Sequence, residues 1–395
     1  MKDNSLEIRT FRSLDDLLGI SESWEELLAS YPLATTFSTP AWLASWWPSF
    51  AKGQELLASG FFGDSRLVAL ALFSITRVQV AKAVSLKQLR LMGDGSNDSD
   101  NLDLPVLPGF EQQFATSLLD FLETERNSWD FAEFNTLPPD SPAAKVLKER
   151  MAARKWLVIE ESRAASAIPL PNTWEKYLEQ LSSEDQKNLV RYERRLGKRY
   201  SVEMYRCSSE SQIPKCLEAL FEHHQARWQA AGESGSFGVA ERRAFYADLS
   251  RRLLSEGRLD LWALELDGQI AAVQFGFRYG RQVFQLQEGN DPRHAPDRVG
   301  FILRGHVLKQ LIADGVQTYD FLGGALGYKA RWGAQARHYF DVHFARPLTM
   351  GAVYLQMTHG AAHSKAWLRK NLPQPAWDAL RKLNLRARRF RGKKP

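Results

Sequence analysis

Hydrophobic and polar positions follow the pattern of a strand hairpin at two places in the chain. Residues Leu56–Val78 (LLASGFFGDSRLVALALFSITRV) predict two strands joined by a turn at Gly63-Asp64. Residues Leu261–Phe277 (LWALELDGQIAAVQFGF) predict a second hairpin, because Asp267-Gly268 is a dipeptide that favours the positive φ angles of a tight turn. The two hairpins are the first indication of an internal repeat.

The segments after each hairpin extend this repeat. A polar loop comes next, then a helix that opens with Gly-Phe, then an extended segment. The loops start at Gly93 and Glu288, the helices at Gly109-Phe110 and Gly300-Phe301, and the extended segments are Trp129–Asn135 and Thr318–Gly324. This order recurs after roughly 190–200 residues, a distance too long for a solenoid repeat.

The repeat predicts an α/β protein with two tandem domains, each a mixed, mainly antiparallel sheet flanked by helices. The first domain is expected at residues 6–163 and the second at residues 164–347, with a junction in the proline-containing stretch Ser162–Asn172. Helical patterns cover Ser183–Arg199 and Ile213–Ala231, and the first domain has a shorter counterpart at Thr39–Trp47.

Composition supports a folded protein of the ordinary soluble class. Of the 395 residues, 44% are hydrophobic and 25% are charged, which excludes a disordered or collagen-like chain. The two cysteines, Cys207 and Cys216, are too few for a disulfide framework or a four-thiolate zinc site. The N-terminal residues lack the apolar segment of a signal peptide, and no apolar run approaches the ~20 residues of a membrane span. A cytoplasmic location is therefore expected.

The positive charge is concentrated at the C-terminus. Residues Lys365–Pro395 contain eleven Lys or Arg and one acid, Asp378, so this segment carries +10 and the rest of the chain carries −4 of the total +6. Residues 348–395 are predicted to form a basic amphipathic tail. It is either a solvated, partly helical end or a contact for an anionic membrane surface, such as the inner face of the membrane. Nucleic acid is a weaker alternative, with tRNA as the exception.

The loop before the second helix has the features of an anion site. The first turn of a helix offers unpaired N–H groups and the positive end of the helix dipole. Gly300 allows close backbone approach, and Arg293, Arg298 and Arg304 add positive charge. The corresponding loop of the first domain is acidic, with Asp94, Asp98, Asp100 and Asp103, and its spacing does not fit a calcium-binding loop. Only the second domain is expected to bind a phosphorylated carrier, which leaves the first as an accessory or acceptor-binding domain.

The order of these segments resembles the GCN5-related N-acetyltransferase (GNAT) fold. More specifically, the chain resembles the tandem GNAT proteins related to the Fem (FemAB/FemX) peptidoglycan transferases, in their bacterial branch associated with exopolysaccharide or cellulose production. The matching segments cover most of residues 6–345. They include TPAWLASWW, NDSDNLDLPV, WDFAEFNTLP, KNLVRYERRLGK, LFEHHQARWQAAGESGSF, EGNDPRHAPDRVGF and DFLGGALGYKARWG.

The resemblance implies an N-acyltransferase that moves an acyl group from a thioester carrier to an amine acceptor. The acyl thioester would lie at a splay between two strands, and the acceptor would be a cell-envelope or exopolysaccharide precursor. One departure concerns the donor: of the pyrophosphate signature Q/R-x-x-G-x-G/A, only Arg298 and Gly300 remain. The carrier is therefore acyl-CoA, the phosphopantetheine of an acyl carrier protein, or an aminoacyl-tRNA.

Such a transfer needs a base for the attacking amine. Asp320 and Glu288 are the candidate bases, with a turn cap or a Lys329 ion pair as the alternative role for Asp320. The resemblance implies that Lys329, together with Tyr328 and Trp332 in GYKARWG, closes over the acceptor; a solvated surface loop is the alternative. Arg227 is a candidate for contact with a carboxylate or phosphate. Its neighbour Trp228 is either a substrate contact or a packing residue.

No metal ion is expected from the sequence. All eight histidines fall between His223 and His363, but there is no C-x-x-C spacing, and the adjacent His223 and His224 diverge on a helix.

Two other functions stay open. The first is an aminoacyl-tRNA-dependent transferase acting on a peptidoglycan precursor; Ser183–Ala231 would supply its coiled-coil arm, but this segment is short and is broken at Tyr200–Gln212. The second is a non-catalytic scaffold in polysaccharide assembly, whose pocket should lack an inward carboxylate and an open anion site.

Overall fold

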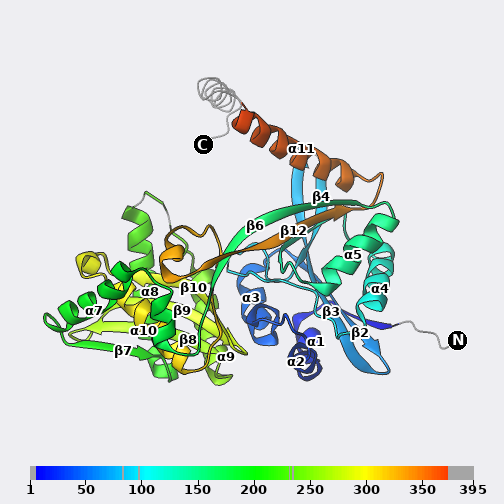
Figure 1. Ribbon diagram of the computed structural model, residues 1–395. Coiled ribbons are helices and arrows are strands. Elements are labelled where there is room, and N and C mark those ends of the chain that lie inside the picture. The colour runs from blue at the N-terminus through cyan, green and yellow to red at the C-terminus, as the bar shows by residue number, and fades with distance from the viewer. Residues whose placement is uncertain (1–5, 82–83, 97, 231, 234, 372–395) are drawn as a thin grey trace.

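The computed structural model describes residues 6–81, 84–96, 98–230, 232–233 and 235–371. Its centre is one continuous twelve-stranded sheet with the order β1-β2-β3-β4-β5-β12-β6-β11-β10-β9-β8-β7. We call strands β1–β5 and β12 with their helices the N-terminal half, and strands β6–β11 with theirs the C-terminal half. The mixed, mainly antiparallel α/β architecture predicted from the sequence is confirmed (Figure 1).

The elements alternate between strands and helices along the whole chain. The first group is β1 (Glu7–Phe11), α1 (Leu14–Leu18), α2 (Ser21–Ala29), the 3-10 helix η1 (Thr36–Ser38), α3 (Pro40–Phe50), β2 (Glu55–Gly63), β3 (Arg66–Ala81), β4 (Val84–Leu91), α4 (Glu111–Thr124), β5 (Phe131–Leu137) and α5 (Pro142–Ala153). The second group is β6 (Leu157–Pro169), α6 (Trp174–Glu179), α7 (Ser183–Gly197), β7 (Val202–Arg206), η2 (Glu210–Gln212), α8 (Ile213–Ala230), α9 (Ala240–Ser255), β8 (Leu259–Leu266), β9 (Gln269–Tyr279), β10 (Gln282–Asn290), η3 (Pro292–Asp297), α10 (Val299–Ala313), β11 (Thr318–Gly323), η4 (Gly327–Trp332), β12 (Gln335–Ala345) and α11 (Met350–Asn371).

Sheet pairing confirms the internal repeat. In one half β2, β3 and β4 form an antiparallel meander, α4 follows, and β5 returns parallel to β4; in the other half β8, β9, β10, α10 and β11 repeat this order. Glu133 pairs with Arg90 and Asp320 with Phe284, so the two acids occupy the third position of matching strands. The glycine prediction was half right: Gly300 lies in the first turn of α10, whereas Gly109 precedes α4 in a turn with φ +91°.

Each half contains one strand that follows the other half in sequence. Strand β6 comes after β5 but lies beside β11 in the C-terminal half, and β12 comes after β11 but lies beside β5 in the N-terminal half; we call this the strand exchange. The stretch Ser162–Asn172, predicted as a junction, contains the end of β6, so the expected boundary at residues 163/164 falls inside a strand. Strand β6 pairs with β11 on one side and with β12 along its length, whereas β12 pairs with β5 of the N-terminal half. Small buried residues, Ala165, Ser166 and Ala167, allow strands to pack closely on both sides of β6. In Figure 1 the two long strands run between the halves.

Both faces of the C-terminal sheet are covered by helices. Leu261 and Ala263 of β8 belong to a core that also contains buried residues of α8 and α9, whereas their neighbours Trp262 and Leu264 pack in a second core with α7 and α10. This alternation is the period-two pattern of a strand buried on both sides. Helices α7 and α8 therefore lie on opposite faces of the sheet and do not pair as a coiled-coil arm, in agreement with the break at Tyr200–Gln212.

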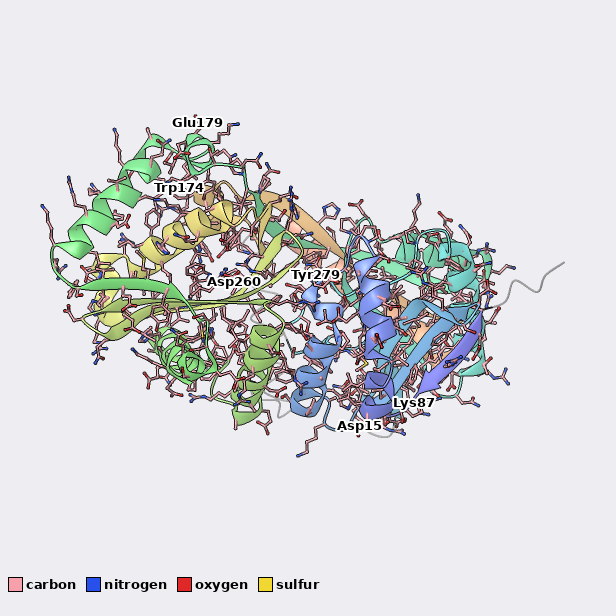
Figure 2. The ribbon with its side chains drawn as sticks, turned by 90° about the horizontal axis from the view of Figure 1, so that it is seen from below. Asp15, Lys87, Trp174, Glu179, Asp260 and Tyr279 are labelled. Carbon is pink, nitrogen blue, oxygen red and sulfur yellow. The ribbon has the colours of Figure 1, made fainter. Side chains whose placement is uncertain are left out.

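Helices α3 and α9 join the halves. Trp42 of α3 meets Phe245 of α9 with ring centroids 5.3 Å apart, and Ser45 donates a hydrogen bond of 2.7 Å to Asp248. Figure 2 shows the halves side by side, with Asp15 on the N-terminal half and Trp174 on the C-terminal half. The shared core fixes the halves against one another, which positions the site described below.

The final described element, α11, extends away from the sheet in Figure 1. Ala352 and Leu355 in its first turns are buried against Leu86 and Phe131 of the N-terminal half. The basic residues of the predicted tail fall in the last helical turns, whose side chains the structure does not describe, and at 372–395, outside the described residues. Within the part of the chain that is described, no helix has both the length and the apolar character needed to cross a membrane.

Candidate active site

Strands β10 and β11 diverge in the middle of the sheet. They pair only from Gln282 to Phe284, opposite Thr318–Asp320, although β10 continues to Asn290. A register irregularity between Gln285 and Gln287 bends β10 as it leaves β11. The splay opens a gap between adjacent strands at the point where the chain turns toward α10.

A pocket of about 380 Å³ occupies this region. It brings together six of the residues proposed from the sequence: Glu288, Arg298, Gly300, Arg304, Tyr328 and Trp332. These come from β10, the start of α10 and η4, three elements separated by up to forty-four residues. The remaining lining residues are Asn290, His294, Ala295, Val299, Phe301 and Arg331.

The first turn of α10 faces the pocket without a side-chain cap. Arg298 precedes the helix in the left-handed conformation, with φ +60° and ψ +35°, and its side chain is exposed. A Cβ atom on Gly300 would lie 2.3 Å from the Asn290 Oδ1 atom, so a larger residue here would have to displace the Asn290 side chain. An uncapped helix start with a cation beside it has the features that bind anions, and the anion site expected from the sequence stays a prediction.

Arg304 and Glu288 form the inner wall of the pocket. Arg304 is buried, bonds the Glu288 carboxylate, and lies 5.6 Å from the ring centroids of Tyr328 and Trp332. The other carboxylate oxygen of Glu288 lies 3.8 Å from Arg227. A proton on Glu288 would weaken both ion pairs, so this carboxylate suits an electrostatic role better than that of a base.

The remaining sequence candidates lie at different depths. Trp332 is 2% exposed and packs on Phe301 with a centroid distance of 4.7 Å, so it forms the floor of the pocket. Tyr328 is 55% exposed and stands at the mouth. Arg293 is bound to Asp291 and does not line the pocket. Trp228 also lies outside the lining and donates a 3.0 Å hydrogen bond to His224.

A second polar cluster surrounds the end of β11. Asp320 accepts a 2.7 Å hydrogen bond from the Leu322 N–H, and its other oxygen lies 3.9 Å from Arg337. Lys329 is buried and donates to the carbonyl oxygens of Phe321 and Gly323, at 3.4 and 3.2 Å. Lys329 therefore stabilises the turn between β11 and η4 through hydrogen bonds to the backbone carbonyl groups of that turn.

Asp100, from the acidic loop of the N-terminal half, completes this cluster. Its carboxylate accepts a 2.8 Å hydrogen bond from the Gly323 N–H. Sequence reasoning placed Asp100 only among residues that would repel phosphate. Its position near Asp320 depends on contact between segments 220 residues apart, which no local pattern reveals.

The environment of these groups alters their protonation. Burial raises the pKa of Asp320 to about 6, against the opposing effects of the Leu322 N–H and Arg337. Burial also raises the pKa of Asp100 to about 6, and the nearby Asp320 adds to this rise. Burial lowers the pKa of Lys329. Carboxyl groups that titrate near neutral pH are suited to accept and return a proton.

Asp100 lines a second pocket, of about 460 Å³, between the two halves. Arg163 supplies a cation at its edge and is held by a 2.6 Å ion pair to Asp341. Gly323 and Gly324 form part of its wall, and none of its lining residues also lines the first pocket. The other lining residues are Asp94, Gly95, Ser99, Asn135, Thr136 and Ala164.

The other aspartates of the acidic loop have structural partners. Asp98 is fully buried, 3.3 Å from Arg242 of α9, and accepts a 2.8 Å hydrogen bond from Tyr246. Asp103 accepts hydrogen bonds from Ser141 and Tyr31. Asp94 pairs with Arg90 at 2.9 Å. These pairings explain the acidic composition of the loop by contacts within the protein.

Comparison with known families agrees with this geometry. Residues 183–330, from α7 to η4, match the family described as acetyltransferase (GNAT) domain. The segment contains the splay and every lining residue of the first pocket except Arg331 and Trp332, which directly follow it. The chain therefore carries a GNAT domain, which places it among the transferases. None of the curated proteins compared with the sequence matches it.

Solved structures extend the likeness over both halves. FemX shares 10% sequence identity with this chain, with a TM-score of 0.59, over 85% of this chain and 96% of FemX. The C-terminal domain of a putative lysylphosphatidylglycerol synthetase from Agrobacterium fabrum shares 12%, with a TM-score of 0.51, over 87% and 95%. A conserved protein of unknown function from Bacteroides thetaiotaomicron shares 13%, with a TM-score of 0.51, over 86% and 100%. The chain therefore shares the fold of FemX over both halves, as the sequence predicts.

Proposed function

We propose that the protein is an N-acyltransferase that moves an acyl group from a thioester carrier to an amine acceptor. The observation that carries this proposal is the splay between β10 and β11, which opens onto the uncapped start of α10. The phosphates of the carrier bind at Arg298 and Gly300, and its acyl end enters the splay beside Glu288. The resemblance to tandem GNAT proteins supports the same arrangement.

The acceptor amine binds in the pocket between the halves. Its nitrogen attacks the thioester carbonyl, the C–N bond forms, and the C–S bond breaks. The proton released by the amine passes to Asp320, a buried carboxylate beside Asp100 of the pocket wall, and from Asp320 to the departing thiolate. Their pKa values of about 6 leave both carboxyl groups largely ionised and able to accept a proton at neutral pH.

The chemistry of the carrier site fits acyl-CoA or the phosphopantetheine of an acyl carrier protein. Arg298 and Arg331 place two cations around the start of α10, where a phosphate would lie. The acceptor class that we propose is an amine on a cell-envelope or exopolysaccharide precursor. Arg163 at the edge of the second pocket suits a precursor with a negative charge.

Two alternative functions have less support. The inward Glu288 and the open anion site both argue against the non-catalytic scaffold, which should lack them. A transferase that uses aminoacyl-tRNA and acts on a peptidoglycan precursor remains the second candidate, supported by the fold shared with FemX. Thiol release from acyl-CoA separates the candidates, because only a thioester donor produces a free thiol.

The anion-site assignment predicts that Arg298→Glu weakens binding of CoA by at least about tenfold. A charge reversal at the start of α10 replaces attraction for phosphate with repulsion, and the new carboxylate offsets the positive end of the helix dipole. Isothermal titration calorimetry with CoA measures the change. Arg298 is exposed, so the variant should keep the melting temperature of the parent protein.

Lys309→Glu is the matched control for this experiment. Lys309 is an exposed cation of α10 that does not line the pocket, so its reversal changes net charge by the same amount. Asp98 of the acidic loop is unsuitable as a control, because the buried carboxylate pairs with Arg242. Equal losses of affinity in Arg298→Glu and Lys309→Glu would contradict a local anion site.

The basic tail is proposed as a contact for anionic membranes. We expect a chain that ends at Ser364 to lose binding to vesicles of phosphatidylglycerol and phosphatidylcholine, since it lacks the +10 segment. The melting temperature should change little, because the buried residues of α11, Ala352 and Leu355, are retained. Vesicle sedimentation at low and high salt tests this. Vesicle binding that is unchanged by the truncation would identify the tail as a solvated end.

A further inference from the structure

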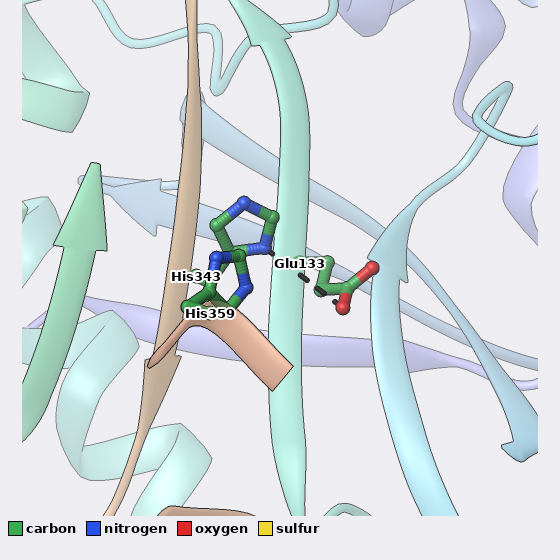
Figure 3. A group of neighbouring side chains, drawn as sticks. All are labelled: Glu133, His343 and His359. Atoms are coloured by element: carbon green, nitrogen blue, oxygen red, sulfur yellow. Dashed lines mark ion pairs between the residues drawn. The ribbon is translucent and has the colours of Figure 1, made fainter. Parts of the chain in front are cut away.

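We propose that Glu133, His343 and His359 bind one divalent transition-metal ion of the zinc class, which fastens α11 to the sheet. The sequence predicted no metal site, because these three residues are far apart in the chain. The three residues belong to β5, β12 and α11, and the sheet register and the packing of α11 bring them together (Figure 3).

The geometry follows from the strand exchange. Because β12 pairs with β5, His343 stands directly opposite Glu133, with the Nδ1 and Oε1 atoms 3.9 Å apart. His359 lies over His343 with a ring-centroid distance of 4.4 Å. One ligand atom from each residue lies within 4.8 Å of the others. Zinc–ligand bonds of about 2.1 Å place tetrahedral ligands roughly 3.4 Å apart, so small side-chain rotations suffice.

His343 has no hydrogen-bond partner in the described part of the protein. Its side chain is 8% exposed, and both ring nitrogens are buried without a donor or acceptor in hydrogen-bond range. Buried polar atoms without partners are uncommon, because a polar atom that loses its hydrogen bonds to water and gains none in the protein costs free energy. A metal ion bound to one ring nitrogen provides a contact that the surrounding side chains do not.

The two partners of His343 are held in orientations suited to ligation. His359 Nδ1 lies 2.8 Å from Glu161 Oε1, so a carboxylate holds this ring in place beside His343. Glu133 accepts a 2.6 Å hydrogen bond from Gln88 on Oε2, which leaves Oε1 toward His343. In metal sites, a ligating histidine typically donates its second ring N–H to a carboxylate, and a ligating carboxylate accepts a hydrogen bond on its second oxygen.

The donor set selects the class of ion. Two imidazoles and one carboxylate suit Zn²⁺ and neighbouring transition metals, whereas Mg²⁺ and Ca²⁺ prefer oxygen ligands only. Three protein ligands leave one coordination position for water. The N-terminal half thus uses Glu133, the third residue of β5, for metal binding. The C-terminal half has Asp320, the proposed base, at the matching position of β11.

A metal ion here would fix the path of the C-terminal helix. Leu355 packs against the sheet one helical turn before His359, so both lie on the same side of α11. Beyond His359 the helix leads toward the basic tail. Metal binding would therefore hold the base of the tail against the N-terminal half and set the direction in which the tail leaves the protein.

The test uses the untagged, full-length protein freed of metal by a chelator. Titration with Zn²⁺ alone should give one ion bound per chain, by calorimetry and by elemental analysis after gel filtration. His359→Ala and Glu133→Gln should weaken binding by at least about 100-fold, because each removes a ligand. Glu161→Gln should weaken it about 10–100-fold, as expected for a supporting carboxylate. His338→Ala is the control, because His338 is an exposed histidine of the same strand outside the cluster.

Two further measurements separate ligation from a structural effect. Zn²⁺ should slow amide hydrogen exchange in residues 350–360 of the parent protein but not of His359→Ala. Co²⁺ should give the parent protein the visible absorption bands of a four- or five-coordinate site, a result that needs no variant to fold. Sub-stoichiometric Zn²⁺ binding with no Co²⁺ bands would overturn the proposal. So would a folded His359→Ala protein that binds Zn²⁺ as tightly as the parent.

Discussion

Asp320→Asn is expected to lower kcat by about 10²–10⁴-fold, the usual contribution of a general base, while the affinity for CoA stays near that of the parent. The asparagine retains an oxygen that can accept the hydrogen bond from the Leu322 N–H, so the turn after β11 is preserved. It cannot accept the proton of the amine. Thiol release from acyl-CoA, followed with a panel of amine acceptors, measures the loss.

The parent enzyme should show a matching pH dependence. Burial raises the pKa of Asp320 to about 6, so the carboxylate that accepts the proton becomes populated as pH rises through this value. The rate of thiol release should therefore increase with pH between about 5 and 7 along an ionisation near 6. Because Asp100 titrates in the same range, the apparent pKa belongs to the pair of carboxyl groups.

Glu288→Gln is the matched control for Asp320→Asn. Its carboxylate contacts Arg304 and lies 3.8 Å from Arg227, so the amide removes charge from the carrier pocket. We expect a higher KM for the carrier and a smaller change in kcat than Asp320→Asn produces. Full activity in a folded, CoA-binding Asp320→Asn protein would contradict the assignment of Asp320 as base. A loss confined to Glu288→Gln would move the role to that residue.

Stability measurements show whether Asp320→Asn acts only through the fold. The pKa of Asp320 is about 6 in the folded protein, against the ordinary value of 3.8 that applies to the unfolded chain. The folded state therefore binds the proton more tightly than the unfolded state does. Folding stability from this group therefore falls as pH rises from about 4 to about 6. Asp320→Asn removes that cost, and its melting temperature at pH 7 should equal or exceed that of the parent. The difference should shrink below pH 4.

The repeated order of elements was predictable because its signals are local. The Asp267-Gly268 turn is a sequence signature in itself, and both central residues have positive φ angles of 50° and 82°. The mostly apolar segments on either side of this turn form β8 and β9 as expected. The pocket position of Arg298 and Gly300, on which the proposed anion site rests, was also visible locally, since both residues follow the same loop in the sequence.

The contacts between distant segments were not predictable in the same way. Nothing near Ser162–Asn172 distinguishes a junction from a strand that pairs with β11 and β12, because small residues and prolines occur in both. Asp100 reaches the proposed catalytic cluster only through contact between the halves. The Glu133–His343–His359 cluster joins residues from three elements for the same reason.

The strand exchange leads to the second large effect: Phe344→Ala should lower the free energy of unfolding by about 3–5 kcal/mol. Phe344 lies on β12, near the end of the chain, yet its fully buried ring packs in the N-terminal half. Its centroid lies 5.9 Å from Trp129, 4.9 Å from Phe134 and 6.0 Å from Trp156. Truncation leaves a cavity among these aromatic rings. Urea denaturation measures the change.

Gln335→Ala is the control, because Gln335 is an exposed residue of the same strand and its change should cost little. Hydrogen exchange then locates the damage. If β12 completes the N-terminal half, Phe344→Ala should accelerate exchange in β5 and leave the amides of α10 in the C-terminal half close to parent values. A loss below about 1 kcal/mol, or faster exchange confined to α10, would be incompatible with the exchanged sixth strand, because a fully buried aromatic ring is expected to contribute several kcal/mol where it packs.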